Sequence, residues 1–468
     1  MGRAAASSTR HVQRKAGECH LVASPTEQDK VRELQRTLYR AAKADPGRRF
    51  HALYDKVYRR DVLERAWELV RRNRGAAGID RLTIQQVELI GVDRLLDKLA
   101  ESLKQGSWRP LPARRVWIPK PGSAEQRPLS IPAVGDRIVQ AALKLVIEPI
   151  FEADMLPCSF GFRPRKTARD ALQVLIDAAW RGRRWVVETD IAWCFESIPY
   201  DRLVQAVEER IVDRQVLKLL RAMLRAGVME AGVVKGGVTG TPQGGVVSPV
   251  LCNIYLHRLD RAWQTRGVGA LVRYADDLLV LCRSRREAEH ALAMLTALLA
   301  ELGLVPKQAK TRIVHLTEAG EGIDFLGFAH QWVRARGQRH LTFLARRPSR
   351  RAMQHARDRI RELTARERLR VPVEQVVQEV NRFLRGWAGY FRYGNSTRQF
   401  DKIRSYAIGR LALFVAKRHK RSRRYGWGIV VHASPDFMGL INLNGTVVAP
   451  RPNRPWREKP NAGGEGRR

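Results

Sequence analysis

The sequence predicts a mixed α and β fold of the α+β class, followed by an all-helical region, and three observations point to it. From about residue 185 short β-rich runs alternate with helical stretches, which suits a sheet covered by helices. Beyond about residue 345 apolar residues recur mainly at helical spacing. The 468-residue chain is 44% hydrophobic, enough to bury a real core.

The first part of the chain combines a basic leader with a helical stretch, and a Gly-punctuated loop, "RRNRGAAGID", follows at 71–80. In "RRVWIPKPGSAEQRPLSIP" (114–132) two β-rich runs flank a Pro-Gly-Ser segment, which predicts a hairpin. A helix is expected directly after this hairpin.

The alternating part begins with the strand "WVVETDI" at 185 and includes a hairpin at 271–282. A helix "REAEHALAMLTALLAEL" should end at Gly303, and a strand "TRIVHL" follows it. These elements predict one sheet with helices on a face.

Three amphipathic helices are expected after residue 345, and they should pack as a bundle. Their apolar positions are Met353, Ala356, Ile360 and Leu363, then Val373, Val376, Val380, Leu384, Trp387 and Phe391, and finally Phe400, Ile403, Ala407, Leu411 and Phe414. The last twenty residues are rich in Pro, Gly and Arg and predict a flexible tail.

The charge balance predicts a polyanionic partner, because 85 Lys plus Arg stand against 47 Asp plus Glu, a formal net charge of +38. No apolar run has the ~18 residues needed to span a bilayer, so nucleic acid is favoured over membrane. We expect a cytoplasmic, nucleic-acid-associated protein, although the Arg- and Ser-rich leader leaves a mitochondrial transit peptide open.

The stretch "LVRYADDLLV" (271–280) places Asp276 and Asp277 side by side between aliphatic runs. Burying two carboxylates costs several kcal/mol unless cations neutralise them, so the pattern predicts a divalent metal site. Neighbouring side chains on a strand point to opposite faces of the sheet. Asp276 and Asp277 can therefore bind one pair of metal ions only if they lie at the tip of a hairpin, and one of them should then contribute more than the other. Asp190, at the end of "WVVETD", qualifies as the second main ligand. The alternative is an ordinary surface turn, which the aliphatic flanks disfavour.

Five ordered blocks of this chain resemble the reverse transcriptases, most closely those encoded by bacterial group II introns. They are "TDIAWCFESI", "GTPQGGVVSPVLCNIYL", "RYADDLLV", "LGLVPKQAKT" and "IDFLGF". The resemblance covers roughly residues 70–430. It implies a right-hand polymerase with fingers and a ferredoxin-like palm at 70–345, a helical thumb or maturase region at 346–418, a leader and helical extension at 1–69 and a basic extension and tail at 419–468.

The resemblance implies that Asp190, Asp276 and Asp277 are catalytic and that, together with Ile191, they contact two Mg²⁺ ions. Two such ions activate a 3′-hydroxyl and stabilise the departing pyrophosphate. Glu196 stands where many relatives carry Asp, and we do not count it as a metal ligand.

The resemblance also implies four nucleotide-binding residues. Phe195 stands where the family keeps an aromatic ring against the sugar of the incoming nucleotide, which would exclude a 2′-hydroxyl; from periodicity alone it would be a core residue. Lys120 and Arg127 match the pair that contacts the triphosphate, and Gln243 in "TPQGG" lies near the nascent base pair.

Further basic residues match regions of the family that hold RNA or DNA, and aromatic residues among them are expected to pack inward. For Lys310 a role in supporting the catalytic hairpin and a plain surface role stay open. The expected nucleic-acid contacts are Arg163, Arg165, Lys166, Lys310, Arg382, Arg385, Arg392, Lys417, Arg418, Lys420 and Arg421.

The resemblance therefore implies an RNA-directed DNA polymerase that extends a DNA primer with dNTPs on an RNA template, and also a maturase that binds a cognate intron RNA in splicing and retrohoming. No C-x-x-C pair is present, so we expect a member without the C-terminal nuclease domain. Three alternatives remain: a splicing factor that mainly binds RNA, a domesticated relative in DNA repair or phage defence, and an RNA-dependent RNA polymerase.

Overall fold

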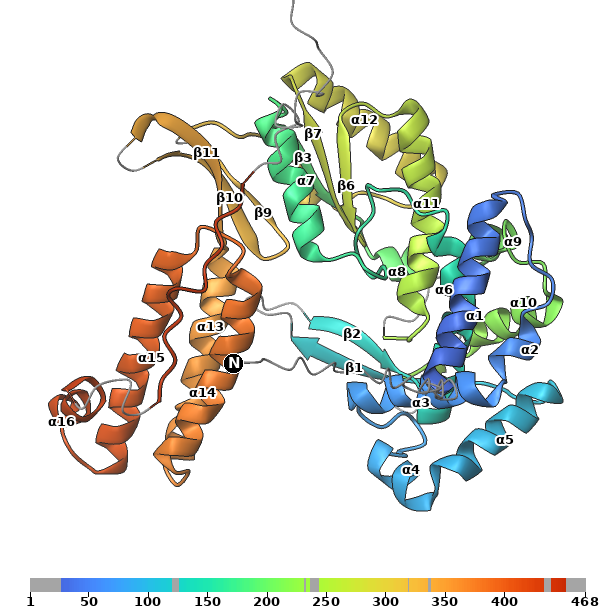
Figure 1. Ribbon diagram of the computed structural model, residues 1–468, viewed down its shortest axis with the longest axis horizontal. Helices are drawn as coiled ribbons and strands as arrows, with labels where there is room; N and C mark the ends of the chain where they lie inside the picture. The colour runs from blue at the N-terminus through green and yellow to red at the C-terminus, as the bar shows by residue number, and fades with distance from the viewer. Residues whose placement is uncertain are drawn as a thin grey trace, which may run out of the picture.

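The computed structural model describes residues 27–119, 126–230, 233–235, 244–318, 320–335, 338–432 and 439–451. In Figure 1 the N-terminal helices (blue) lie on one side of the view and the C-terminal helices (orange) on the other. The helices are α1 (Glu27–Ala44), α2 (Tyr54–Val57), α3 (Arg60–Asn73), α4 (Ile84–Ile90), α5 (Val92–Lys104), α6 (Val134–Glu152), α7 (Ala168–Trp180), α8 (Cys194–Ser197), α9 (Tyr200–Glu208), α10 (Arg214–Arg225), α11 (Ser248–Arg266), α12 (Arg285–Glu301), α13 (Arg350–Leu363), α14 (Val373–Phe391), α15 (Thr397–Arg418) and α16 (Arg423–Trp427). The strands are β1 (Ala113–Pro119), β2 (Gln126–Ile131), β3 (Trp185–Asp190), β4 (Val228–Glu230), β5 (Val233–Lys235), β6 (Ala270–Tyr274), β7 (Asp277–Cys282), β8 (Arg312–His315), β9 (Ile323–Phe325), β10 (Phe328–Ala335) and β11 (Gln338–Pro348).

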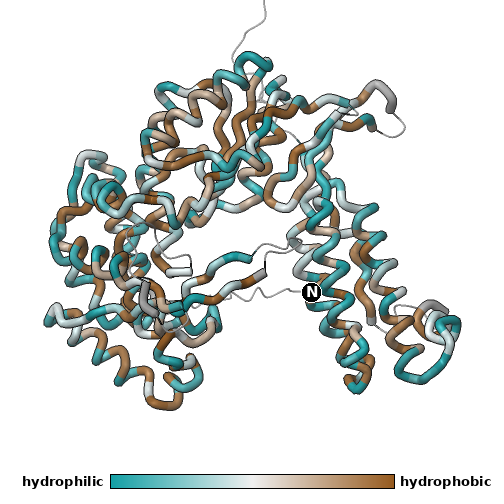
Figure 2. Tube along the Cα trace, turned by 180° about the vertical axis from the view of Figure 1, so that it is seen from behind, coloured by the Kyte–Doolittle hydropathy of each residue, from teal (hydrophilic) through white to brown (hydrophobic). Residues whose placement is uncertain are grey.

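The central sheet has the strand order β6-β7-β3-β8, with antiparallel neighbours throughout. Strand side chains alternate between faces, so the sheet carries two hydrophobic cores. Val187 and Val280 face a core shared with α11 and α12, whereas Val186 and Leu279 face a second core shared with α7. Both faces are covered, which explains why these strands read as nearly continuous apolar runs. Figure 2 shows them as one of the most hydrophobic parts of the trace.

The predicted hairpin at 114–132 is confirmed, since β1 and β2 pair antiparallel from Arg114 with Ile131 to Pro119 with Gln126. The short strand β4 joins β1 in parallel, a pairing that was not predicted. The helix expected after the hairpin is α6, which is apolar on nearly every side and buried among the N-terminal helices. A helix that is hydrophobic all round is expected in exactly such a central place.

The C-terminal region contains the three expected amphipathic helices, α13, α14 and α15, and every apolar position named for them is buried except Val373, which is half-buried. Trp387 and Phe391 pack inward as expected, whereas Tyr390 is 42% exposed.

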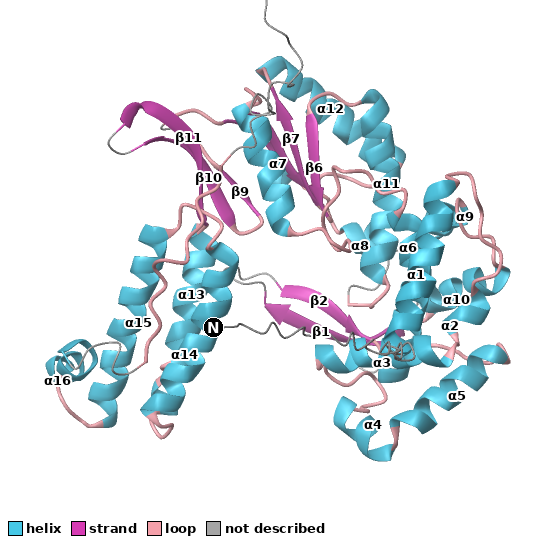
Figure 3. Ribbon diagram, viewed as in Figure 1, coloured by secondary structure: helices cyan, strands magenta, loops and turns pink. Residues whose placement is uncertain are grey.

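A small sheet, β9 to β11, precedes these helices, and the sequence did not predict it. Its long hairpin pairs β10 with β11 over 328–348, where frequent Arg residues hide the alternation of a strand. Figure 3 shows this sheet between the central sheet and α13 to α15. The mixed fold with its helical C-terminal part is thus confirmed; the four domain boundaries stay predictions.

In the part of the chain that the structure describes, no helix combines the length and apolarity needed to cross a bilayer.

Candidate active site

The three predicted carboxylates meet at one end of the central sheet. Tyr274 pairs with Asp277 at the end of the β6–β7 hairpin, so Ala275 and Asp276 form a two-residue turn. Asp190 ends β3 directly opposite Asp277. Ala275 has a left-handed φ of 56°, as tight two-residue turns require. The backbone N–H of Ile191 donates to the Asp276 carbonyl at 3.2 Å, which ties the turn to the end of β3.

Burial and mutual repulsion disfavour negative charge at this site. Desolvation, followed by the charges of Asp276 and Asp190, raises the pKa of Asp277 to about 7. Desolvation and then Asp190 raise the pKa of Asp276 as well. A shift of this kind at a cluster of carboxylates is typical of a site completed by a cation.

The side chain of Lys310 supplies one positive charge to this site. Nζ of Lys310 lies 2.6 Å from Oδ2 of Asp190. Partial burial opposes the charge on Lys310, but the hydrogen bond to Asp190 and the attraction of Asp277 and Asp276 outweigh it and raise its pKa. The backbone N–H of Lys307 also donates to the Asp190 carbonyl at 2.7 Å, so this segment holds the end of β3. Of the two open roles for Lys310, the geometry favours support of the site.

The donor set fits Mg²⁺ in kind, because Asp190, Asp276 and Asp277 offer carboxylate oxygens. Among the described residues no three His, Cys, Asp or Glu side chains lie close enough together to hold a metal ion by themselves. Mg²⁺ does not need such a cage: it keeps several waters and takes one or two carboxylates together with substrate phosphates. The site therefore suits an ion that arrives with a nucleotide.

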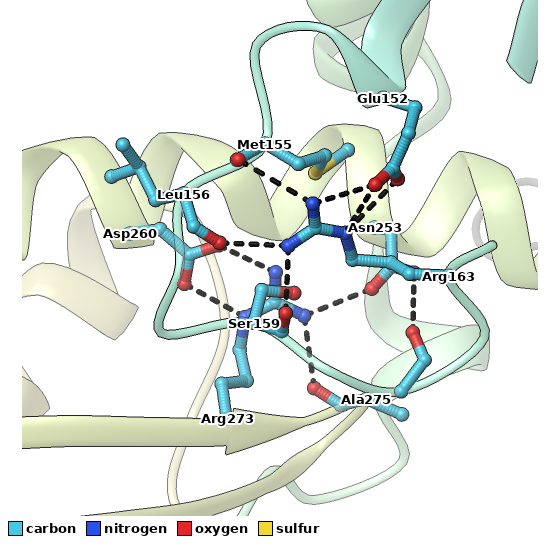
Figure 4. A network of polar contacts seen from close by, with 10 residues as sticks. Glu152, Met155, Leu156, Ser159, Arg163, Asn253, Asp260, Arg273 and Ala275 are labelled. Atoms are coloured by element: carbon cyan, nitrogen blue, oxygen red, sulfur yellow. Dashed lines mark hydrogen bonds and ion pairs between the residues drawn. The ribbon is translucent and has the colours of Figure 1, made fainter. Parts of the chain in front are cut away.

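The turn is held from below by a buried network that the sequence did not reveal (Figure 4). Arg273, with no exposed surface, donates two hydrogen bonds to Asp260, at 2.8 and 2.5 Å. A third goes to Oδ1 of Asn253 at 3.0 Å and a fourth to the Ala275 carbonyl at 3.2 Å. Asp260 and Asn253 lie on α11, so this helix fixes the turn. The only signal was an Arg inside an apolar strand, which indicates a buried partner.

The segment "SFGFR" closes the other side of the turn. Phe160 N–H donates to the Arg273 carbonyl at 2.9 Å, and Arg273 N–H donates to the Cys158 carbonyl at 2.7 Å. A Cβ on Gly161 would lie 2.4 Å from the backbone nitrogen of Ala275, so only glycine permits this approach. Asn253 completes the contact by donating to the Gly161 carbonyl at 2.8 Å.

Arg163 belongs to this support, and its internal partners do not favour the predicted contact with nucleic acid, which stays a prediction. Its side chain is 5% exposed and pairs with Glu152 at 2.7 Å. The remaining donors go to the carbonyls of Leu156, Ser159 and Met155. With every N–H group engaged, none is left for a phosphate. The density of Arg in this segment could not show which one folds inward.

The predicted nucleotide-binding residues are described only in part. Phe195, on α8, is half-buried and packs against the larger core. Arg127 is exposed on β2, and its charge lowers the pKa of Asp276 against the larger effect of burial. Arg115 on β1 was not predicted to take part, but its charge lowers the pKa of Glu196, again against the larger effect of burial. Lys120 and Gln243 lie outside the described residues.

The remaining basic residues lie mostly at the surface. Arg165, Arg382, Arg385, Lys417, Lys420 and Arg421 are exposed, and Lys166, Arg392 and Arg418 are half-buried.

Two of the half-buried residues have internal partners. Nε of Arg392 donates to the Thr446 carbonyl at 3.1 Å. Nη1 of Arg418 donates to the carbonyls of Leu369 and Val371, both at 2.6 Å, and so ties the end of α15 to the loop before α14. Their binding roles stay predictions, as do those of the exposed residues.

Comparison with known proteins gives two family matches. Residues 118–330 match the reverse transcriptase (RNA-dependent DNA polymerase) family, and residues 353–428 match the group II intron maturase-specific domain.

Among individual relatives, Protein YkfC of Escherichia coli is 32% identical over 350 residues, which cover 66% of this chain and 90% of the relative. The group II intron-encoded protein LtrA of Lactococcus lactis is 36% identical over 214 residues, 45% of this chain and 35% of LtrA. An uncharacterized 91 kDa protein in the cob intron of Schizosaccharomyces pombe is 40% identical over 166 residues, 36% of this chain and 20% of that protein. The matched region thus spans most of YkfC but about a third or less of the two intron proteins.

Proposed function

The chain belongs to the family of group II intron reverse transcriptases and maturases, and from this membership we propose that it extends a DNA primer with dNTPs on an RNA template at the end of the central sheet. RNA-directed DNA polymerisation is the reaction of this family. One observation supports the placement above all: Asp190 and Asp277 are direct partners across β3 and β7, with Asp276 in the adjoining turn.

We assign the metal ligands as Asp190 and Asp276, with Asp277 and the backbone of Ile191 in support. When bound there, two Mg²⁺ ions supply a lowered pKa for the primer 3′-hydroxyl and positive charge for the pyrophosphate. Lys310 orients the Asp190 carboxylate through its 2.6 Å contact.

Around these carboxylates the protein binds and selects the nucleotide. Arg127 and Lys120 hold the triphosphate, Gln243 contacts the nascent pair, and the ring of Phe195 excludes a ribose 2′-hydroxyl. The support for Arg127 is its electrostatic effect on both Asp276 and Glu196.

The test is primer extension on an RNA template by the wild type, Asp276→Ala and Glu289→Ala. Glu289→Ala is the control, because it removes an equal charge on the exposed side of α12, far from the turn. We expect Asp276→Ala to lose at least about a hundredfold in rate, because a metal site supplies several kcal/mol to the transition state. EDTA should abolish wild-type synthesis, and Glu289→Ala should match the wild type. Undiminished synthesis by a folded Asp276→Ala protein would refute the site.

A second activity of the same family is binding of intron RNA as a maturase, and the match of residues 353–428 favours it here. The proposed partners are a cognate intron RNA in a ribonucleoprotein, an RNA template and a DNA primer or target. Splicing assays with Asp276→Ala separate the two activities: splicing that survives without DNA synthesis would make RNA binding independent of the carboxylates. If the protein is instead a domesticated relative, no intron should flank its gene, and the sequence around the gene would show this.

A further inference from the structure

Residues 439–451 form a segment without helix or strand that runs from the C-terminal helices to α7, and we name it the strap. It follows the residues that match the maturase-specific domain, 353–428. In Figure 1 it rises in red past α15 toward α7. The backbone of Arg451 contacts a side chain 278 positions earlier in the chain. Two regions far apart in the sequence are therefore joined by this one segment.

The first half of the strap is anchored in the core of the C-terminal helices. Leu440 and Leu443 are each 2% exposed and pack in the hydrophobic cluster that contains α14 and α15. Asn381, in the middle of α14 and 5% exposed, donates from Nδ2 to the Gly439 carbonyl at 2.6 Å and accepts at Oδ1 from Ile441 N–H at 3.0 Å. A buried amide side chain needs such partners, and here the backbone of the strap supplies them.

The second half, 446–451, is held in another way, because none of its side chains is fully buried. The Thr446 carbonyl accepts from Nε of Arg392, the residue after α14, at 3.1 Å. Val448 N–H in turn donates to the Arg392 carbonyl at 2.7 Å. Two hydrogen bonds to one residue fix this part of the strap beside the end of α14. Burial of apolar surface contributes little here, so covering the core is not the reason for this half.

Helix α7 supplies the other attachment. Nε2 of Gln173 donates to the Arg451 carbonyl at 2.9 Å, and also to Oδ1 of Asp177, one turn along the helix, at 2.9 Å. One turn before Gln173, Cζ of Arg169 lies 4.2 Å from the centre of the Tyr393 ring. Residues four apart share a helix face, so one face of α7 meets both the strap and the end of α14. Because α7 packs on the central sheet, this face joins the C-terminal region to the sheet that carries the carboxylates.

We propose that the strap fixes the position of α14 and α15 relative to the central sheet, and that Gln173 and Asn381 are positioning residues for DNA synthesis over many nucleotides. This inference rests on the polymerase function proposed above. Each addition moves the product past the carboxylates, and the next addition in the same binding event requires the helices beyond the sheet to keep their place. A strap held by α14 at one end and by α7 at the other restrains their movement. The addition of a single nucleotide should depend on the strap much less than the number of additions does.

The first experiment measures the length of DNA made in one binding event by the wild type and Gln173→Met, with excess unlabelled primer–template as a trap. Methionine fills a similar space but donates no hydrogen bond. The median product length should fall about threefold, because one neutral hydrogen bond holds the far end of the strap. The rate of adding the first nucleotide should stay within about twofold of the wild type. Gln173→Lys should restore the product length, since lysine reaches as far and still donates.

The matched control is Gln105→Met. Nε2 of Gln105 donates to Oε1 of Glu101 one helical turn away, as Gln173 does to Asp177, but Gln105 lies directly after α5 among the N-terminal helices. Its product length should equal that of the wild type. Asn381→Leu releases the strap at its other end and should shorten the product further, with a lower melting temperature because a buried anchor is lost. Gln173→Met decides the proposal even if Asn381→Leu does not fold.

A second measurement needs no synthesis. Spin labels at Ala297→Cys on α12 and Ser405→Cys on α15, both exposed positions, report by pulsed EPR the distance between the sheet and the C-terminal helices. The distribution of distances should be broader in Gln173→Met than in the wild type, and Gln173→Lys should narrow it again. The protein without the two new cysteines controls for labelling of native thiols.

Either equal product lengths or equal distance distributions for Gln173→Met and Gln105→Met would overturn the proposal. So would a first-nucleotide rate that falls as much as the product length, because the defect would then lie at the carboxylates rather than in the strap. A wild type that makes no DNA would refute the polymerase function alone, since the distance between the labels still shows whether the strap holds the helices in place.

Discussion

Arg273 and Arg346 lie in different sheets, and both are almost completely buried, at 0% and 2% exposure. Arg273 has a carboxylate, an amide and a carbonyl as partners, and all of them come from the protein. Among the described residues Nε and Nη1 of Arg346 have no hydrogen-bond partner, and Arg346 lies opposite His330 in the sheet. The first arrangement places the charge against a carboxylate, whereas the second places it against the Phe328 ring, 5.4 Å from its centre. Burial alone therefore does not say what a charged residue does.

The largest expected effect is on the paired arginine. Arg273→Met should lower the free energy of unfolding by about 3–5 kcal/mol, because Asp260 is left as a buried, unpaired charge. Denaturant unfolding followed by circular dichroism measures it. The double variant Arg273→Met with Asp260→Leu should recover most of that loss, since both charges are then removed. If the double variant is as unstable as the single one, packing around Arg273 matters more than its charge.

The glycine that touches the turn should show a smaller effect. Gly161→Ala places a Cβ against the Ala275 backbone and should cost about 1–3 kcal/mol of stability, as overpacking does elsewhere. DNA synthesis should fall more steeply than stability, because the strain acts on the turn that carries Asp276. Primer extension well below the melting temperature measures this, and Gly386→Ala, which meets no neighbouring atom and like Gly161 lacks a positive φ, is the control for the added methyl group. Equal effects of the two substitutions would remove the turn from the explanation.

A pH experiment tests His330, which lies opposite Arg346 in the sheet. Burial, and then the charge of Arg346, lower the pKa of His330 to about 3. The unfolded chain therefore binds a proton near pH 6.5 that the folded chain refuses, and stability is lost as the pH falls below about 6.5. The loss should approach ~1.4 kcal/mol per pH unit for this residue. Unfolding at pH 7 and pH 5.5 should show a smaller difference for His330→Leu than for the wild type; identical differences would mean that His330 finds an acceptor.

The smallest effect is expected at the exposed arginine that serves as a reference. Arg285 is 73% exposed and pairs with Glu289 one helical turn away at 2.8 Å. Arg285→Met should change stability by no more than about 0.5 kcal/mol, because water screens such pairs. Thermal melting in low and high salt is sufficient to see it. If Arg285→Met lost as much free energy of unfolding as Arg273→Met, the effect of an arginine would not depend on its burial.

The sequence predicted the elements whose side chains follow one simple period. The aliphatic strands around Asp190 and Asp276 and the amphipathic helices α13 to α15 were recognisable in this way. The sheet formed by β10 and β11 was not, because its Arg-rich alternation looks like a solvated surface until the strands pair. The spacing of apolar residues shows which face of a helix or strand is buried, but not which other element of the chain that face packs against.

The candidate site was predictable to a similar extent. Asp190, Asp276 and Asp277 stand out because carboxylates at the ends of apolar strands need a reason. Arg163, Arg273 and Arg346 do not stand out in a chain with 85 basic residues. Whether each is paired inside, unpaired inside or free in solvent depends on contacts across about 10 to 50 or more positions, and only the folded structure supplies them.

The network beneath the catalytic turn also restricts how this sequence can change over generations. Arg273, Asp260 and Asn253 satisfy one another inside the core, so a change at any one of them leaves an unmatched group behind. Descendants that alter this network must pass through a compensating second change, whereas Arg285 and Glu289 are free to drift independently. The turn that holds Asp276 is therefore inherited as a unit with the helix beneath it, and substitutions at these three positions should appear together across related genes.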